Sequence, residues 1–288
     1  MGKTGIHVSE IVFGGVEIEI TNRIGIKSVK DMLPEEKAIE LLYTALEESI
    51  NFFDTTRMYG NSENLIGRAF RDKRNVVILT TKCVHLLNDD RNLPSCRKLK
   101  KKITTSLYDS LEYLQPDHVD FFMPHHSPVK VLENDEIISI FSALKERGIF
   151  KKLDASTYTK EETRITIKKN FWNMTQLPLN LLDQRQSTCI EKAPKKRIEI
   201  VIRSVHLKGL LSSSSGKYHH PKLKNVEKHL EQYKLFLEVT NQDFTSFATK
   251  FTIFFPKDSV LIVNIKNEYM ELAFEAVDNT YLNAMDRK

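Results

Sequence analysis

The amino-acid sequence predicts a parallel (β/α)8 barrel, the TIM-barrel architecture. Short apolar segments alternate with longer amphipathic segments almost to the C-terminus. Such alternation requires parallel strands joined by right-handed crossovers, in either an open sheet or a closed barrel. Eight of these units fit into 288 residues, and that number favours the closed barrel. We therefore expect residues 1–288 to form a single barrel domain.

The eight expected strands are short, and most are bounded by polar residues. They cover residues 11–13, 51–54, 76–81, 118–123, 152–155, 173–177, 198–202 and 259–263. The first strand leads into a glycine pair, Gly14 and Gly15. Strands at this spacing, separated by amphipathic segments, indicate repeated βα units.

The connecting segments carry apolar residues at helical spacing. In the first of them Ala38, Leu41, Leu42 and Ala45 recur with the period of a helix face. Ser62 precedes a second such face and is expected to cap that helix. The predicted helices cover residues 35–49, 62–71, 97–114, 135–147, 160–169, a short stretch near 189, 226–238, 243–254 and 268–277.

The composition excludes several classes of protein. A net charge of +5 spread over 28% charged residues of both signs is too dilute for a nucleic-acid surface. No segment approaches the roughly 20 apolar residues that span a bilayer, and the N-terminus lacks a signal sequence. Three separated cysteines predict neither disulfides nor a metal site. We expect a soluble cytoplasmic protein with no nucleic-acid or membrane partner.

Four polar residues follow three neighbouring predicted strands. Asp54 ends the second strand, Tyr59 lies in the loop after it, Lys82 follows the third, and His125 follows the fourth. Functional groups of such barrels gather at the carboxyl ends of the strands, so these side chains should meet at one rim. Each residue type is common at a loop, and their joint placement is what predicts a site.

These four side chains form a working chemical unit. A phenol is a poor proton donor at neutral pH, but a neighbouring ammonium stabilises the phenolate and lowers the phenol's pKa. A carboxylate such as Asp54 would hold the ammonium of Lys82 beside Tyr59. An imidazole at His125 could orient a carbonyl and support negative charge on its oxygen.

The segment INFFDTTRMYGNSENLIGRAF resembles the signature of the aldo-keto reductase family. In that signature an apolar strand ends in Asp, Tyr-Gly follows five residues later, and Ser-Glu leads into Leu-Ile-Gly. The resemblance covers residues 3–278. TGIHVSEIVFGG is similar to the family's opening hairpin and first strand, VVILTTKC to its Lys strand, and SLEYLQPDHVDFFMPHH to its His strand.

The resemblance implies a role for each matching residue. Tyr59 would be the general acid, Lys82 would tune its pKa, Asp54 would pair with Lys82, and His125 would place a carbonyl substrate. It also implies NADPH as cofactor, with NADH as the alternative. The residues implied to hold that cofactor are Gly14, Gly15, Ser156, Gln176, Arg203, Ser204, Leu207, Gly209 and Lys266.

Several positions depart from the family pattern on the cofactor side. Asp154 replaces a usual glycine and is expected to add a negative charge near the site. Leu179 and Arg203 replace aromatic residues, Asn264 replaces a glycine, and Ala273 replaces an asparagine that usually contacts adenine. The resemblance therefore supports proton transfer more directly than cofactor binding.

Two functions remain open from the sequence. The first is an oxidoreductase that reduces an aldehyde or ketone with NADPH. A rim carrying Arg57, His126, Lys208 and the 217–222 loop favours a sugar-like or other polar carbonyl substrate. The second is a catalytically weak or inactive barrel that binds a nucleotide or a partner. A metal-dependent hydrolase is disfavoured because strand ends lack a suitable set of ligands, and the basic run 192–197 is expected to be a solvated face.

Overall fold

The chain folds into a closed barrel of eight parallel strands, paired in sequence order from β1 to β8 with β8 returning to β1. It was analysed as a computed structural model that describes residues 4–18, 33–169, 171–193, 196, 198–212, 224–255 and 259–262. The strands are β1 (Ile11–Gly14), β2 (Phe52–Asp54), β3 (Ile78–Cys83), β4 (Val119–Pro124), β5 (Phe150–Ser156), β6 (Met174–Pro178), β7 (Glu199–Arg203) and β8 (Ser259–Ile262). The predicted barrel is confirmed.

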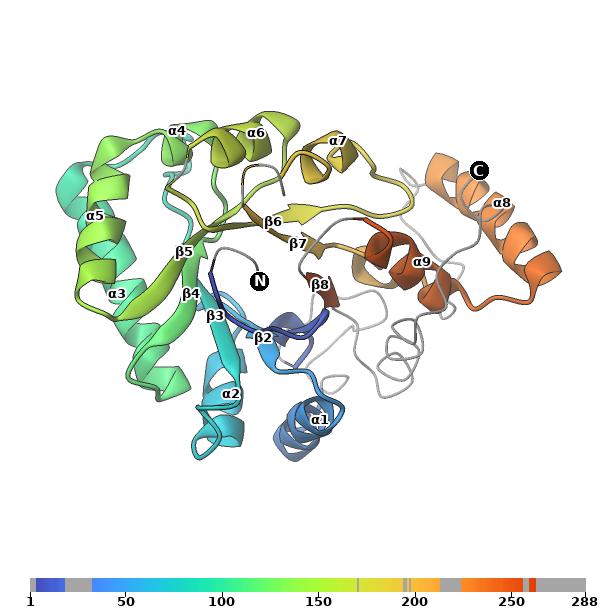
Figure 1. Cartoon of the computed structure of the whole chain (residues 1–288), viewed down its shortest axis with the longest axis horizontal. Helices are drawn as coiled ribbons and strands as arrows, with labels where there is room; N and C mark the ends of the chain where they lie inside the picture. The colour runs from blue at the N-terminus through green and yellow to red at the C-terminus, as the bar shows by residue number, and fades with distance from the viewer. Residues whose placement is uncertain are drawn as a thin grey trace.

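Helices surround this ring of strands (Figure 1). The main ones are α1 (Glu35–Glu47), α2 (Ser62–Phe70), α3 (Cys96–Leu114), α5 (Asp135–Glu146), α6 (Lys160–Lys168), α8 (Lys224–Thr240) and α9 (Phe244–Ile253). Shorter turns are η1 (Gly15–Ile18), α4 (Val129–Leu132), α7 (Ser187–Ile190) and η4 (Leu207–Gly209). The helix expected at residues 268–277 lies outside the described residues.

Two apolar layers hold the barrel, because alternate strand residues face its interior and its helices. The interior cluster contains Val12, Phe52, Phe121, Met123, Met174 and Val201. The larger layer packs Phe13, Phe53, Phe122 and other strand residues against α1, α2, α3 and α5. Burial on both strand faces explains why the strands are apolar without strict alternation in sequence.

The segment before β1 packs against the barrel interior instead of forming the expected hairpin. Residues 4–10 contain no strand, and Ile6 and Val8 contact the interior cluster. The amide of Thr4 donates to Oε1 of Glu199 at 3.2 Å, and Ser9 and Asn51 exchange side-chain to backbone hydrogen bonds. These contacts fix the segment in place of cross-strand pairing.

Helix α2 differs from its prediction at its first residue. Its N-cap is Asn61, whose side chain makes no capping bond, and Ser62 is a buried helix residue. The hydroxyl of Ser62 lies 3.0 Å from that of Thr55. Ser62 was therefore wrongly predicted as the cap, because its hydroxyl ties the helix to the end of β2.

Candidate active site

Asp54 and Lys82 form a buried ion pair inside the carboxyl end of the barrel. The Nζ of Lys82 lies 2.5 Å from Oδ1 of Asp54 and donates to the backbone oxygen of Thr55 at 3.1 Å. Both side chains are almost fully enclosed. Burial lowers the pKa of the Lys82 ammonium, and the charge of Asp54 opposes that shift. Asp54 thus holds the ammonium of Lys82 in place, away from solvent.

Tyr59 stands beside this cation. Its ring centroid is 5.5 Å from Nζ of Lys82, and the edge of the His125 ring meets it at a centroid distance of 5.9 Å. The turn that presents Tyr59 is closed by a hydrogen bond from its amide to the oxygen of Thr56, 3.0 Å long. Asp54, Tyr59, Lys82 and His125 are therefore brought together, as the sequence predicted.

His125 directly follows β4 and is anchored on two sides. Its amide donates to the oxygen of Cys83 at 3.2 Å, and its Nδ1 lies 3.3 Å from the hydroxyl of Thr56. Burial, together with the positive charges of Lys82 and Arg203, lowers the pKa of His125 to about 3. The imidazole is therefore neutral at neutral pH, with one ring nitrogen that carries a proton and one that can accept a hydrogen bond.

Gln176 connects this group to the cofactor side of the predicted site. Its Nε2 donates to Oδ2 of Asp54 at 2.6 Å, so both oxygens of that carboxylate are bound. Its Oε1 is buried with no hydrogen-bond partner among the described residues. Ser156 pairs with Gln176 across β5 and β6. The amide of Ser156 donates a hydrogen bond to Oγ of Ser127. A buried, unpaired acceptor thus lies next to Ser156.

Arg203 ends β7, and its guanidinium packs on an aromatic ring of this chain. It lies 4.1 Å from the centroid of the Tyr158 ring and donates to the oxygen of Thr157 at 2.8 Å. Burial lowers the pKa of Arg203, against the opposing influence of Tyr158 and Tyr59. One face of the guanidinium is therefore covered by Tyr158.

The loop after β7 has an unusual backbone. Ser204, Leu207, Lys208 and Gly209 all have positive φ, between 45° and 94°. Non-glycine residues seldom adopt this conformation. The turn is closed by its own backbone, because the amides of Leu207 and Gly209 donate to the oxygens of Ser204 and His206 at 3.3 and 2.9 Å. The imidazole of His206 fixes the loop to α9, because its Nε2 lies 3.0 Å from the hydroxyl of Thr249.

Gly14 and Gly15 bring the end of β1 against β2 and α2. Gly14 pairs with Asp54 in the sheet. A Cβ on Gly15 would lie 2.6 Å from Ser62 Oγ and 2.9 Å from the oxygen of Asp54, so a larger residue would push β2 and α2 away. The remaining cofactor residue, Lys266, and the altered positions Asn264 and Ala273 lie outside the described residues.

Asp154, which was expected to add a negative charge near the site, is enclosed in the barrel. Its side chain faces the barrel interior with both carboxyl oxygens lacking partners among the described residues. Burial and the nearby carboxylate of Glu199 raise its pKa well above the usual range. The carboxyl group therefore keeps its proton to higher pH than an exposed aspartic acid does, which the sequence could not show because the shift depends on enclosure.

Arg57 was expected at the substrate rim, but its guanidinium is bound by other side chains of the protein. Its guanidinium lies 2.7 Å from Oε2 of the buried Glu63 and 4.2 Å from the ring centroid of Tyr113. These contacts neutralise its charge and hold it against α3. It therefore presents no free cation to a substrate.

His126, which was expected at the rim, lies there beside two residues that the sequence did not identify, His85 and Tyr158. The His85 ring lies 4.9 Å from that of His125, and the edge of His126 meets Tyr158 at 4.8 Å. His126 is also 3.3 Å from Oε1 of Glu162. Each follows β3, β4 or β5 closely, and that position is the signal that could have identified them.

The described residues contain no cluster of three or more His, Cys, Asp or Glu side chains that could hold a metal ion. Across the same ranges, no helix has both the length and the apolar character needed to cross a membrane. The 217–222 loop, which was expected to contribute to the substrate rim, falls outside them.

Comparison with known proteins gives consistent matches. The aldo/keto reductase family model matches residues 10–276. An uncharacterized oxidoreductase of Bacillus subtilis is 27% identical over 181 residues, which are 62% of this chain and 58% of the relative. The L-galactose dehydrogenase of Arabidopsis thaliana is 25% identical over 213 residues, 72% of this chain and 55% of the relative. The chain thus spans little more than half the length of these two relatives.

Solved structures agree in fold. The holo form of an aldo-keto reductase from Bacillus halodurans superposes with a TM-score of 0.77 at 23% identity, covering 99% of this chain and 92% of the other. The barrel fold is therefore shared with that structure. The family model covers well over half of the chain, and this protein belongs to the aldo/keto reductase family.

Proposed function

We propose that this protein is an oxidoreductase that reduces an aldehyde or ketone to an alcohol with NADPH. The observation that carries the proposal is the meeting of Tyr59 with the buried Lys82–Asp54 pair and the neutral His125 at the carboxyl end of the barrel. A phenol beside an enclosed cation is suited to giving up a proton, and family membership makes a carbonyl the expected acceptor.

Each of the four side chains has a distinct task in this proposal. Tyr59 donates its proton to the carbonyl oxygen as that oxygen becomes an alkoxide. The ammonium of Lys82, held by Asp54, stabilises the phenolate that remains. His125 binds the carbonyl oxygen through its neutral ring and fixes the orientation of the carbonyl carbon.

The residues present fit a nicotinamide dinucleotide. The unpaired Oε1 of Gln176 offers an acceptor for a carboxamide N–H, and Ser156 lies beside it in the sheet. Ser204, Leu207 and Gly209 lie in the loop after β7, at the carboxyl end of the barrel, and are the proposed contacts for the diphosphate. Bound NADPH would supply a hydride to the carbonyl carbon. Lys266, Gly14 and Gly15 complete the proposed cofactor set, and NADH is the alternative donor.

A polar, sugar-like carbonyl is the proposed substrate class. The rim consists of His85, His126, Tyr158 and Arg203, which offer hydrogen-bond donors and aromatic edges instead of an apolar wall. One relative is an L-galactose dehydrogenase, an enzyme named for a sugar. Polar groups at a rim favour hydroxylated ligands because each hydroxyl needs a partner when it leaves water.

Two measurements test the proposed function. Fluorescence titration with NADPH and with NADH should show saturable binding, and a panel of sugar aldehydes and simple aldehydes should include a substrate. Tyr59→Phe should bind NADPH as wild type does but lose about 10²–10⁴-fold in kcat. The matched control is Tyr108→Phe, on the exposed side of α3, which should keep full activity.

The outcomes separate the two functions that the sequence left open. Absence of binding at millimolar nucleotide would contradict the oxidoreductase proposal. Tight nucleotide binding without reduction of any carbonyl in the panel would favour the alternative, a catalytically inactive barrel that binds a nucleotide or a partner. Equal kcat for Tyr59→Phe and wild type would remove Tyr59 from its proposed role.

A further inference from the structure

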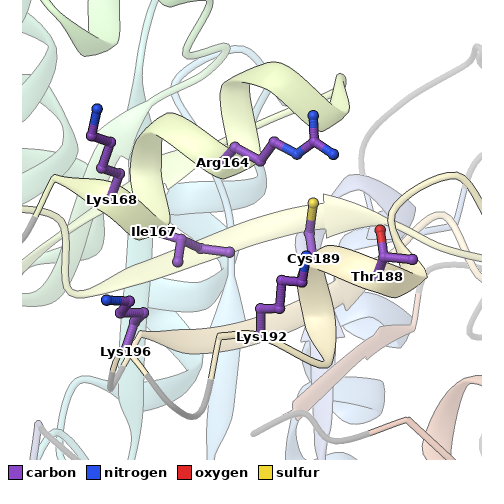
Figure 2. A pocket seen from close by; sticks show the side chains of 7 residues that line it. All are labelled: Arg164, Ile167, Lys168, Thr188, Cys189, Lys192 and Lys196. Atoms are coloured by element: carbon purple, nitrogen blue, oxygen red, sulfur yellow. The ribbon is translucent and has the colours of Figure 1, made fainter.

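A small pocket lies on the outer wall of the barrel, between α6 and the segment that runs from α7 toward β7 (Figure 2). Its cavity measures about 170 Å³. It is lined by Arg164, Ile167, Lys168, Thr188, Cys189, Lys192 and Lys196. None of these residues belongs to the proposed catalytic or cofactor set, and Figure 2 shows them in front of the sheet, not within the barrel.

Every charged residue that lines the pocket is basic. Arg164 and Lys168 come from α6, while Lys192 and Lys196 come from the segment after α7, and all four are exposed. No carboxylate lines the cavity. None of the four forms an ion pair with a carboxylate within the described ranges. The basic run expected to be a plain solvated face thus contributes one wall of a concave site.

The four cations repel one another modestly in water, and a bound anion would relieve that repulsion. Arg164 and Lys168 are four residues apart on one helix, where like charges repel. The fold then places two further cations across a small cavity from them. An anion between the two walls would remove that repulsion and accept several charge-assisted hydrogen bonds.

The floor and the edge of the pocket set the size and type of the anion. Ile167 and the buried Cys189 lie between the two basic walls (Figure 2), and Ile167 packs on the main core. Thr188 adds a hydroxyl at the rim. The planar guanidinium of Arg164 can bind two oxygens of one tetrahedral anion, and flexible lysine ammonium groups can reach the others. A cavity of about 170 Å³ suits a phosphate group with a few attached atoms and excludes a dinucleotide.

We propose that this pocket is a second binding site that takes the phosphate group of a small anionic ligand. It lies outside the barrel, so its occupancy is independent of the cofactor proposed for the barrel's carboxyl end. The residues that would bind the ligand are the four cations and one hydroxyl that α6 and the α7 segment place around the pocket.

Calorimetric titration of the full chain with inorganic phosphate and with glycerol 3-phosphate tests the proposal. The double variant Lys168→Gln/Lys192→Gln removes one cation from each wall. The matched control is Lys98→Gln/Lys101→Gln, which removes two exposed lysines from α3. Titrations are run at one ionic strength, set with sodium chloride, and the melting temperature of each variant is measured to show that it is folded.

For each probe, we expect the α3 control to bind as tightly as wild type. We expect the pocket variant to bind each probe at least about tenfold more weakly than wild type. Hydrogen exchange should slow on ligand addition in peptides covering residues 160–168 and 187–193. Tighter binding of glycerol 3-phosphate than of phosphate would show that the ligand is an organic phosphate, and the reverse order would show that free phosphate is the ligand. Equal affinities for the pocket variant and wild type, or no binding to wild type at millimolar probe, would overturn the proposal.

Discussion

Burial determines the charge state of the two residues that carry the most unusual pKa values. Asp154 and His125 are both enclosed, and enclosure disfavours the charged form of each, so the pKa of the acid rises and that of the base falls. His125 is therefore uncharged at neutral pH, and Asp154 keeps its proton to higher pH than an exposed aspartic acid does. The proposed site therefore contains the cations of Lys82 and Arg203 opposite one carboxylate, that of Asp54, which suits an oxygen that becomes negative.

Asp154 should make the free energy of unfolding fall with rising pH. Its native pKa lies above the unfolded value of about 3.9, so the native state holds a proton that the unfolded state releases, and stability decreases from about pH 4 upward. Asp154→Asn removes this dependence. Relative to wild type, it should gain up to about 1.4 kcal/mol per pH unit between about pH 5 and pH 7.

Urea unfolding of both proteins at the two pH values measures this effect. Asp72→Asn, at an exposed position, serves as the control and should show a much smaller change with pH. A difference between Asp154→Asn and wild type that is the same at both pH values would mean that Asp154 is ionised in the native protein.

The pH profile of the reaction should show no ionisation of His125. Because burial lowers the pKa of His125 to about 3, its ring stays neutral between about pH 5 and pH 8. The profile of kcat/KM should therefore lack an acidic limb near the ordinary histidine pKa of about 6.5. An acidic limb there that disappears in His125→Gln would contradict the neutral ring.

At the scale of elements, a buried glutamate joins α2 to the back of the site. Oε1 of Glu63 accepts hydrogen bonds from the hydroxyls of Thr81 at 2.6 Å and Ser110 at 2.7 Å, and Oε2 binds Arg57. Thr81 lies next to Lys82 on β3, and Ser110 lies on α3. Glu63, the second residue of the Ser-Glu pair in the family-like motif, therefore holds α2 against β3 and α3.

Loss of Glu63 should destabilise the protein markedly. Glu63→Ala leaves two buried hydroxyls and the guanidinium of Arg57 without their acceptor, which we expect to cost about 2–4 kcal/mol of unfolding free energy. Glu112→Ala, at an exposed position of α3, should change it by less than about 0.5 kcal/mol. Chemical unfolding monitored by circular dichroism distinguishes the two, and equal stabilities would show that the Glu63 contacts contribute nothing.

The sequence predicted the existence and order of the elements because apolar periodicity is local. It placed strand ends less well: β3 was expected to stop at Thr81, yet it continues through Lys82 to Cys83, because those residues pair with Met123 and Pro124. Polar residues that face the barrel interior interrupt the apolar pattern without ending the strand. The role of Ser62 could not be predicted either, because its hydroxyl meets that of Thr55 only when α2 packs on β2.

At the scale of the whole molecule, barrel closure brings the site together. Gln176 and Asp54 are 122 residues apart and bond to each other because β2 and β6 surround one interior. Strand order alone was enough to predict that Asp54, Lys82 and His125 share a rim. It could not predict that Arg203 packs on Tyr158, that Arg57 pairs with Glu63, or that the 192–196 segment faces α6 across a basic pocket, because these contacts depend on side-chain packing.

Deuterium transfer tests most directly whether this barrel reduces carbonyls with Tyr59 as the acid. The protein is incubated with NADPH deuterated at C4 of the nicotinamide, separately in each stereochemical form, and with the best aldehyde of the panel; the alcohol is then analysed by mass spectrometry. We predict one deuterium on the carbinol carbon from one of the two forms, with the rate reduced about 10²–10⁴-fold in Tyr59→Phe. An alcohol without deuterium from either form, or the same rate of transfer in Tyr59→Phe, would contradict the account.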